Sequence, residues 1–520
     1  MSKTKETPKQ GDHRLVAVID IGASAIRIVV AELDSDGEWR RLDRAARPVF
    51  LGRDVFMTGF IGRESLLQAV RILRGYREML DGWQIDDKNV RVIATSAIRE
   101  AKNRDIFLDR VQIQTGLRVD VVEGIEENHL TYMAVQHAIG SMRPQFARSS
   151  AIILEVGGGT TELMLLRRGK MAAAHSLRLG TIRLEQQVNP SWESASRIEE
   201  YLRENIRVTR EILDAELELD KIRYYVAVGG DARLAANTVG RQEEEHFRVI
   251  ERSDFNDLMK RLQRLTVDEI VRELGVTYNE AEGLVPALLV YKVFLDATSA
   301  DQLIVPDVSI REGVLLGLAG EGTARLEEQF YNQVVASARS IGKKFHYDEV
   351  HSRHVTMLAL SLFDQLADEH GLGNKERILF EVACLLHDIG TYIRASGHHK
   401  HGQYIIQNSE IFGLSNDDLK IVSNVVRYHR KASPMPSHGF YTSLRRDQRM
   451  AVVKLAAILR IADALDRGHM QRVSAVRVEH RDDEVLIHCE RSGDISVEKY
   501  GMELKGRMFQ EVYGYRVLIV

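Results

Sequence analysis

Short apolar runs alternate with amphipathic segments over the first third of the chain. From Val16 to Leu33, two apolar runs flank a polar turn, which predicts a strand, a tight turn and a returning strand. Helical periodicity follows around Glu64 to Leu80, and the run Val90 to Thr95 predicts another strand. The pattern continues with a helix, a strand and a helix, at about Ala97, at Val119 to Val122 and at Glu127 to Gly140. Strands that alternate with helices predict an α/β layer.

The opening hairpin pattern returns later in the chain. Ala151 to Leu166 again contains two apolar runs, now separated by the glycine turn Gly157 to Gly159. A third glycine turn, Gly229 and Gly230, follows the strand-like Tyr224 to Val228 and precedes a predicted helix. Arg241 to Leu318 is predicted to be mainly helical, with a strand at Gln302 to Val305. Two copies of one hairpin predict two related lobes.

The pattern changes to long amphipathic helices from about Gln329, and these helices carry most of the histidines. An all-α region is therefore expected as far as about Met470. Val473 to Val520 alternates again, which predicts a small α/β cap with a helix near Met502 to Phe509. We expect four domains with these bounds: 13–142, 143–320, 321–470 and 471–520.

Composition limits the class of protein. The chain has 520 residues, a formal net charge of −4 and two cysteines, Cys384 and Cys489, so it is expected to be a multidomain globular protein with reduced thiols. The polar opening from Met1 to Arg14 has no apolar signal region, and no stretch reaches the roughly 18 apolar residues that span a bilayer. We expect a cytoplasmic protein without a membrane partner. The weak net charge also argues against general DNA binding.

Glycine-rich turns between strands allow backbone amides to approach a phosphate closely, because no Cβ blocks them. Three turns are candidates for phosphate binding, and each could instead be an ordinary hairpin or strand-to-helix turn. Glu155 and Glu162 flank the second turn and could hold magnesium beside the phosphate, since Mg²⁺ prefers carboxylate and phosphate oxygens. The candidate phosphate ligands are Asp20, Gly22, Ser24, Gly157, Gly158, Gly159, Thr160, Thr161, Gly229 and Gly230.

A series of motifs through both lobes resembles the exopolyphosphatase/guanosine pentaphosphate phosphohydrolase family. The motifs are Val18-Ile19-Asp20-Ile21-Gly22, Ala94-Thr95-Ser96-Ala97-Ile98-Arg99-Glu100-Ala101, Gly124-Ile125-Glu126-Glu127, Glu155-Val156-Gly157-Gly158-Gly159-Thr160-Thr161-Glu162, Leu179-Gly180-Thr181-Ile182-Arg183-Leu184 and Arg311-Glu312-Gly313-Val314. The resemblance implies an actin-like ATPase fold of two ribonuclease H-like lobes. It also implies magnesium-dependent removal of terminal phosphates, and a homodimer.

Carried over to this sequence, the resemblance gives Glu126 the role of the general base that activates water, and Glu155 and Glu162 the role of metal ligands. Arg99 is the first candidate for a cation that neutralises phosphate charge, with a solvated surface cation as the alternative. Two features depart from the family pattern. Glu155 stands where aspartate is usual, and Ser24-Ala25 stands where an asparagine-serine pair is usual, so altered, slow or absent chemistry is also open.

The helical half carries a second pattern of candidate ligands. Leu385-Leu386-His387-Asp388-Ile389-Gly390 and Leu459-Arg460-Ile461-Ala462-Asp463 resemble the metal-binding steps of the HD phosphohydrolase superfamily. The resemblance implies a divalent transition metal held by His351, His387, Asp388 and Asp463, with His401 and His429 as the extra ligands of two-metal members. The basic segments His398 to His401 and Arg427 to Lys431 could instead bind a long polyanion.

The sequence therefore favours an exopolyphosphatase that releases terminal orthophosphate from inorganic polyphosphate. The first alternative is hydrolysis of the 5′ γ-phosphate of guanosine pentaphosphate at the same site. The second is a sensor of polyphosphate or of a guanosine alarmone with weakened catalysis.

Overall fold

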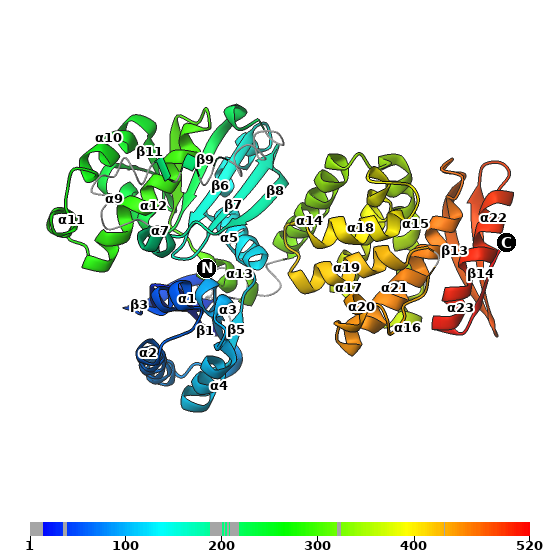
Figure 1. Cartoon of the computed structure of the whole chain (residues 1–520), viewed down its shortest axis with the longest axis horizontal. Coiled ribbons are helices and arrows are strands. Elements are labelled where there is room, and N and C mark those ends of the chain that lie inside the picture. The colour runs from blue at the N-terminus through cyan, green and yellow to red at the C-terminus, as the bar shows by residue number, and fades with distance from the viewer. Residues whose placement is uncertain are drawn as a thin grey trace, which may run out of the picture. The chain divides into compact units, whose positions relative to one another are not determined.

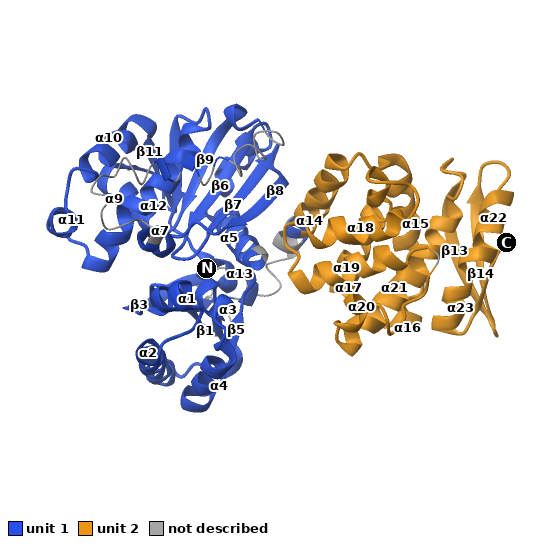
Figure 2. Cartoon of the chain, viewed as in Figure 1, with its two compact units in different colours: residues 1–330 blue, residues 331–520 orange. Residues whose placement is uncertain are grey.

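The computed structural model describes residues 14–34, 39–187, 200–201, 203–204, 207, 218–319, 324–430 and 432–520. The chain forms two compact units, residues 1–330 and 331–520 (Figure 2). The polar opening, the expected boundary at 320 and Lys431 lie outside the described residues, and the four-domain division stays a prediction. None of the described helices combines the length and the apolar character needed to cross a membrane.

The first lobe of unit 1 is built on a five-stranded sheet with the order β3-β2-β1-β4-β5. β1 pairs antiparallel with β2 and parallel with β4, so the predicted opening hairpin is confirmed. Both faces of β1 are covered, since Ala17 and Ile19 face one core and Val16 and Val18 face another, which explains its continuous apolar run. The strands are β1 (Arg14–Ile21), β2 (Ala25–Leu33), β3 (Trp39–Pro48), β4 (Val90–Ala94) and β5 (Val119–Val121).

The second lobe contains a seven-stranded sheet with the order β10-β11-β12-β9-β6-β7-β8 (Figure 1). The repeated hairpin is confirmed as β6 and β7, which pair antiparallel, while β9 runs parallel to β6. The sheet strands are β6 (Ser150–Val156), β7 (Thr161–Arg167), β8 (Lys170–Leu177), β9 (Ile222–Val228), β10 (Arg241–Glu244), β11 (Phe247–Glu251) and β12 (Gln302–Pro306). The stretch from Arg241 is mainly helical as predicted, but two strands at its start were missed: β10, which is an exposed edge strand without an apolar face, and the short β11 beside it.

Helices surround both sheets of unit 1. The single helix expected from Ala97 is divided into α3 and α4. The helices are α1 (Leu51–Thr58), α2 (Arg63–Gly82), α3 (Ser96–Glu100), α4 (Arg104–Thr115), α5 (Gly124–Ala138), α6 (Arg143–Phe146), α7 (Thr181–Gln187), α9 (Gly230–Val239), α10 (Arg252–Leu262), α11 (Val267–Leu274), α12 (Tyr278–Asp296) and α13 (Ile310–Leu318). The buried apolar α12 packs against α7, α9, α10 and α11 and β6 of the second lobe.

Unit 2 is helical and ends in a three-stranded sheet of order β13-β14-β15, as the sequence predicted (Figure 1). Its helices are α14 (Ala324–Lys344), within which the division between the units falls, α15 (Glu349–Gln365), α16 (Ala367–His370), α17 (Asn374–Leu386), α18 (His398–Gln407), α19 (Asn416–Tyr428), α20 (Gly439–Thr442) and α21 (Arg446–Leu465). The cap contains β13 (Val473–Arg481), β14 (Glu484–Arg491), α22 (Ser496–Lys505), α23 (Arg507–Tyr513) and β15 (Arg516–Ile519).

Candidate active site

The three glycine turns of unit 1 converge on one cleft with a volume of about 750 Å³. The β1–β2 turn, the β6–β7 turn and the turn from β9 into α9 each contribute to its wall. Nine of the residues predicted to bind phosphate or metal line it: Asp20, Gly22, Ser24, Glu155, Gly157, Gly158, Thr160, Gly229 and Gly230. Most of the residues predicted from the glycine turns therefore line this one cleft.

The second glycine turn is held by a close contact with the start of α7. Thr181 and Ile182 donate backbone hydrogen bonds to the carbonyls of Gly157 and Gly158, both at 3.0 Å. A Cβ at Gly180 would come within 2.3 Å of the Gly158 carbonyl oxygen, so no side chain fits there. Glycine is required at this position for the turn and the helix to approach each other.

Four of the carboxyl groups in or beside the cleft belong to the sequence motifs: Asp20, Glu127, Glu155 and Glu162. Burial raises the pKa of Asp20 and of Glu155, and the charge of Asp20 raises the pKa of Glu155 further. Burial also raises the pKa of Glu127 to about 7, although the charge of Arg99 opposes this shift. Neighbouring buried carboxyl groups of this kind are typical of sites that bind cations or move protons.

The structure corrects the choice between the two adjacent glutamates of α5. Glu126 is exposed and is not among the described residues that line the cleft. Glu127 lines the cleft, and its side chain is only 13% exposed. Residues next to each other on a helix point about 100° apart, so only one of the pair can face the substrate. The side of α5 that faces the cleft could not be read from the motif alone.

The predicted phosphate ligand Arg99 lies beside this glutamate. Its guanidinium donates to Glu127 Oε2 and to the Val122 carbonyl, both at 2.6 Å. Neither Arg99 nor the predicted ligands Gly159 and Thr161 is among the described residues of the cleft wall. The geometry makes Arg99 a positioning residue for the Glu127 carboxylate.

Glu162 lies behind the cleft wall rather than on it. Its carboxylate accepts hydrogen bonds from Asn128 Nδ2 at 3.0 Å and from Ser176 Oγ at 2.7 Å. Burial raises its pKa well above the usual range, and the charge of Glu127 adds to that shift. Glu162 is therefore fixed by α5 and β8, next to the cleft residues.

Sequence reasoning gave no role to the arginines that line the cleft, among them Arg27, Arg233 and Arg311. Arg27 lies on β2 beside Asp20, and its charge interacts with those of the other two arginines. The signal was available at Arg27, which is a charged residue between the apolar residues Ile26 and Ile28 of its strand. Buried arginines suit phosphate because the planar guanidinium offers several donors to its oxygens.

The donor set of the cleft fits magnesium. Asp20 and Glu155 offer hard carboxylate oxygens, and Glu127 interacts with both groups. The Oδ1 atom of Asn128, beside Glu162, is buried without a hydrogen-bond partner among the described residues. The residues present could thus hold a divalent cation together with a phosphate.

Unit 2 gathers a second cluster of ligand atoms. His351 on α15 and His387 after α17 bring their Nε2 atoms to 3.3 Å, and Asp463 Oδ1 of α21 lies 3.7 Å from His351 Nε2. Asp388 Oδ1 lies 3.1 Å from His398 Nε2 and 3.5 Å from the Nε2 of His429. These two groups of three ligands could each hold a metal ion.

In the four histidines of this cluster, the Nδ1 atom already has a hydrogen-bond partner. Each Nδ1 lies within hydrogen-bond distance of an acceptor, which leaves the Nε2 lone pair for a metal. The acceptors are Asp466 Oδ2 for His351, Cys384 O for His387, Ala395 O for His398 and Val426 O for His429. The donor chemistry therefore fits a transition metal.

The residue that joins this cluster from α18 differs from the prediction. His398, the first residue of α18, lies beside Asp388 and His429, whereas His401 is absent from the groups of ligand atoms found among the described residues. The segment has three histidines within four positions, and only the start of the helix decides which of them points inward. His398 replaces His401 in the proposed ligand set.

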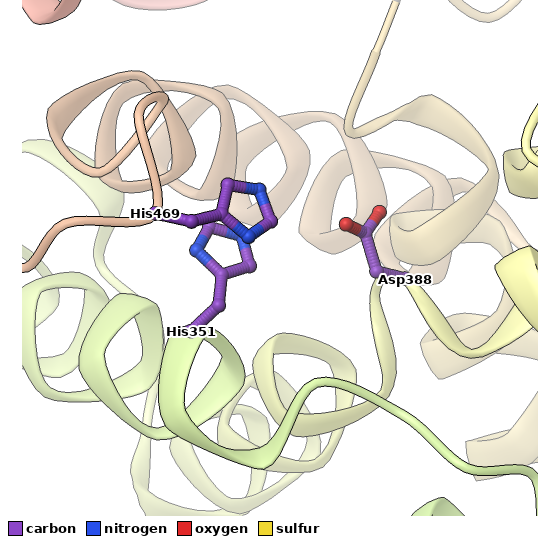
Figure 3. Close-up of side chains that lie close together, drawn as sticks. All are labelled: His351, Asp388 and His469. Carbon is purple, nitrogen blue, oxygen red and sulfur yellow. The ribbon is translucent and has the colours of Figure 1, made fainter.

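A further histidine approaches the cluster from the loop after α21. His469 stacks on His351 with ring centroids 3.6 Å apart, and Asp388 points toward the two rings from across the opening (Figure 3). The ligand atoms of the three residues all lie within 4.8 Å of one another. No motif marked His469, because its position depends on how the chain turns after Leu465.

The fold and the cleft together define an actin-like phosphatase. The model of the Ppx/GppA phosphatase family matches residues 29–321, and that of Ppx/GppA phosphatase, domain III, matches residues 335–492. The chain therefore belongs to the Ppx/GppA phosphatase family, and it is a phosphoanhydride hydrolase.

Individual relatives are distant. A guanosine-5′-triphosphate,3′-diphosphate pyrophosphatase of Photobacterium profundum is 22% identical over 458 residues, which is 86% of either chain. A bifunctional 3-dehydroquinate synthase/phosphatase of Fusobacterium nucleatum is 24% identical over 59% of this chain and 47% of its own length. The solved exopolyphosphatase of Cytophaga hutchinsonii has the same fold, with a TM-score of 0.52 and 21% identity over 59% of this chain and 98% of its own.

Proposed function

We propose that the cleft of unit 1 releases terminal orthophosphate from inorganic polyphosphate, with Glu127 as the general base. The observation that carries this proposal is the position of Glu127. Its carboxylate lines the cleft, is held by Arg99 and has a pKa raised to about 7 by burial. A base whose pKa lies near neutral pH can both accept and release a proton during turnover.

In the proposed reaction, the terminal phosphate lies against the glycine turns and Ser24. A water molecule on the Glu127 side attacks its phosphorus and gives a proton to the Glu127 carboxylate. The new oxygen–phosphorus bond forms as the bridging bond breaks, and the leaving phosphate chain keeps the electron pair. Arg27, Arg233 and Arg311 neutralise the charge of the chain.

Asp20 and Glu155 would hold Mg²⁺ in this cleft, and Thr131 orients the Glu155 carboxylate by donating its hydroxyl hydrogen bond. When bound, Mg²⁺ supplies positive charge to the phosphate oxygens. This contact of Glu155 supports a metal role for the longer side chain that stands where aspartate is usual.

Guanosine pentaphosphate is the alternative substrate for the same residues. The name of the Photobacterium profundum relative supports it, while that of the Cytophaga hutchinsonii structure supports polyphosphate. Both substrates present a terminal phosphoanhydride. Parallel assays with the two substrates separate the alternatives.

The test compares magnesium-dependent orthophosphate release by the wild type, Glu127→Gln and Glu126→Gln. Loss of a general base costs roughly 100-fold to 10,000-fold in rate, so Glu127→Gln should be nearly inactive. Glu126→Gln is the matched control on the exposed side of α5 and should keep its rate. The reverse result would return the role of base to Glu126. Tight polyphosphate binding by an inactive wild type would favour the sensor.

A second candidate function belongs to unit 2. We propose that its histidine–aspartate cluster binds a divalent transition metal and hydrolyses a phosphoester. Six side chains with nitrogen or oxygen donors favour this, and all of them except Asp388 are buried: His351, His387, Asp388, His398, His429 and Asp463. Metal analysis of the purified chain tests the binding, and the absence of metal would contradict it.

A further inference from the structure

A row of arginines leads along one face of the first sheet, away from the centre of the cleft. Arg27 of β2, and Arg44 and Arg41 of β3, all line the cleft. In the ladder between the two strands, Arg27 is opposite Ala46, Val29 is opposite Arg44 and Ala31 is opposite Arg41. Since strands rise about 3.4 Å per residue, Arg44 and Arg41 lie about 7 Å and about 14 Å farther along than Arg27.

A bulge in β3 brings the last two arginines to the same face. Residues three positions apart in a regular strand point to opposite faces. The pairing of β3 with β2 shifts between Val30 and Ala31, so that Leu42 is an additional residue and Arg41 returns to the cleft side. Bulges re-aim side chains in this way next to functional sites.

The two outer arginines of this row, Arg44 and Arg41, have no acidic partner among the described residues. Among the residues that the structure describes, neither Arg41 nor Arg44 makes a side-chain hydrogen bond or an ion pair, and both are exposed. Their neighbour Arg40 points to the other face and pairs with Glu32 at 3.0 Å. Both arginines are exposed and line the cleft, so they are accessible to a long ligand bound there.

We propose that Arg44 and Arg41 form a second anion subsite that binds phosphates of the substrate distant from the one being hydrolysed. The inference rests on the proposed function, because the reacting phosphate is placed at the glycine turns. Arg27 connects this subsite with the catalytic centre, so a linear ligand can contact the whole row. The ligand is a chain of phosphates or, with the same chemistry, the second phosphate group of a nucleotide.

Binding to the Glu127→Gln protein tests the subsite without turnover. Arg41→Ala/Arg44→Ala in that background should bind long-chain polyphosphate about tenfold more weakly, a loss expected for two exposed charge contacts. Pyrophosphate, which is too short to span the row, should bind with unchanged affinity. Arg40→Ala is the matched control from the same strand and should bind both ligands normally.

Three outcomes would overturn or redirect the inference. Unchanged polyphosphate binding, or an equal loss for pyrophosphate, would overturn it. A loss with guanosine pentaphosphate but not with long-chain polyphosphate would assign the subsite to the nucleotide's second phosphate group and overturn the phosphate-chain form. An inactive wild type would contradict the proposed function. The subsite would still be tested, because polyphosphate binding is measured directly.

Discussion

The two candidate sites differ in the elements that build them and in the groups that they offer to a ligand. The cleft of unit 1 is built from strand turns, with backbone amides, carboxylates and arginines around it. The cluster of unit 2 is built from helices, with imidazoles whose outer nitrogens are already engaged. Carboxylates suit hard cations and imidazoles suit transition metals, so the two units should differ in the metal that each requires.

The two sites also differ in how burial shifts the pKa of a central side chain. Burial raises the pKa of Glu127, so this group can exchange a proton near neutral pH. In unit 2, burial lowers the pKa of His387 to about 4, which keeps its ring neutral and able to bind a metal. These shifts agree with the roles proposed for the two groups, proton transfer for Glu127 and metal binding for His387.

The largest expected effect is the loss of metal from unit 2. His387→Ala removes a ligand that is completely buried and should abolish the bound transition metal measured by elemental analysis. Magnesium-dependent orthophosphate release should persist, because the proposed base and magnesium ligands belong to unit 1. The control is Glu127→Gln, which should lose release and keep its metal. Loss of both properties in either variant would contradict the separation of the two sites.

A smaller loss of metal affinity is expected when Asp466, which contacts the proposed ligand His351, is changed. Asp466 Oδ2 lies 2.8 Å from His351 Nδ1 and fixes that ring. Partners of this kind contribute about 10-fold to 100-fold to metal affinity, so Asp466→Asn should weaken metal binding by that factor in a chelator competition. Asp364→Asn changes a carboxylate that pairs with Arg377 instead, and should leave the affinity unchanged. Equal affinities of Asp466→Asn and the wild type would contradict the role of Asp466.

Much of the fold follows from the sequence because its strongest patterns are local. The hairpins β1–β2 and β6–β7 are each marked by two apolar runs and a turn, and the structure has both. β3 escaped detection, because an edge strand with four arginines has no continuous apolar face. β10 was missed for the same reason.

The sequence motifs predicted where the candidate sites lie, but not which side chain of each motif faces the site. The glycine turns identified the cleft because amide positions follow from the chain itself. The choice between Glu126 and Glu127, or between His398 and His401, depends on which side of a helix packs inward. The arginine row depends on strand register and a bulge, which only the pairing of β2 with β3 reveals.

The smallest expected effect is the pH dependence of orthophosphate release. It shows which unit contains the group whose titration controls the rate. Glu127 accepts a proton only when ionised, and burial raises its pKa to about 7. Orthophosphate release should therefore rise with pH, and kcat/KM should fall by about tenfold for each pH unit below that pKa. Histidines of unit 2 could titrate in the same range, since the usual pKa of histidine is about 6.5. The profile is therefore measured in the wild type and in His387→Ala. The same acid limb in both proteins would place the titrating group in unit 1, as expected for Glu127, whereas a limb that shifts in His387→Ala would mean that the histidine cluster takes part in the reaction.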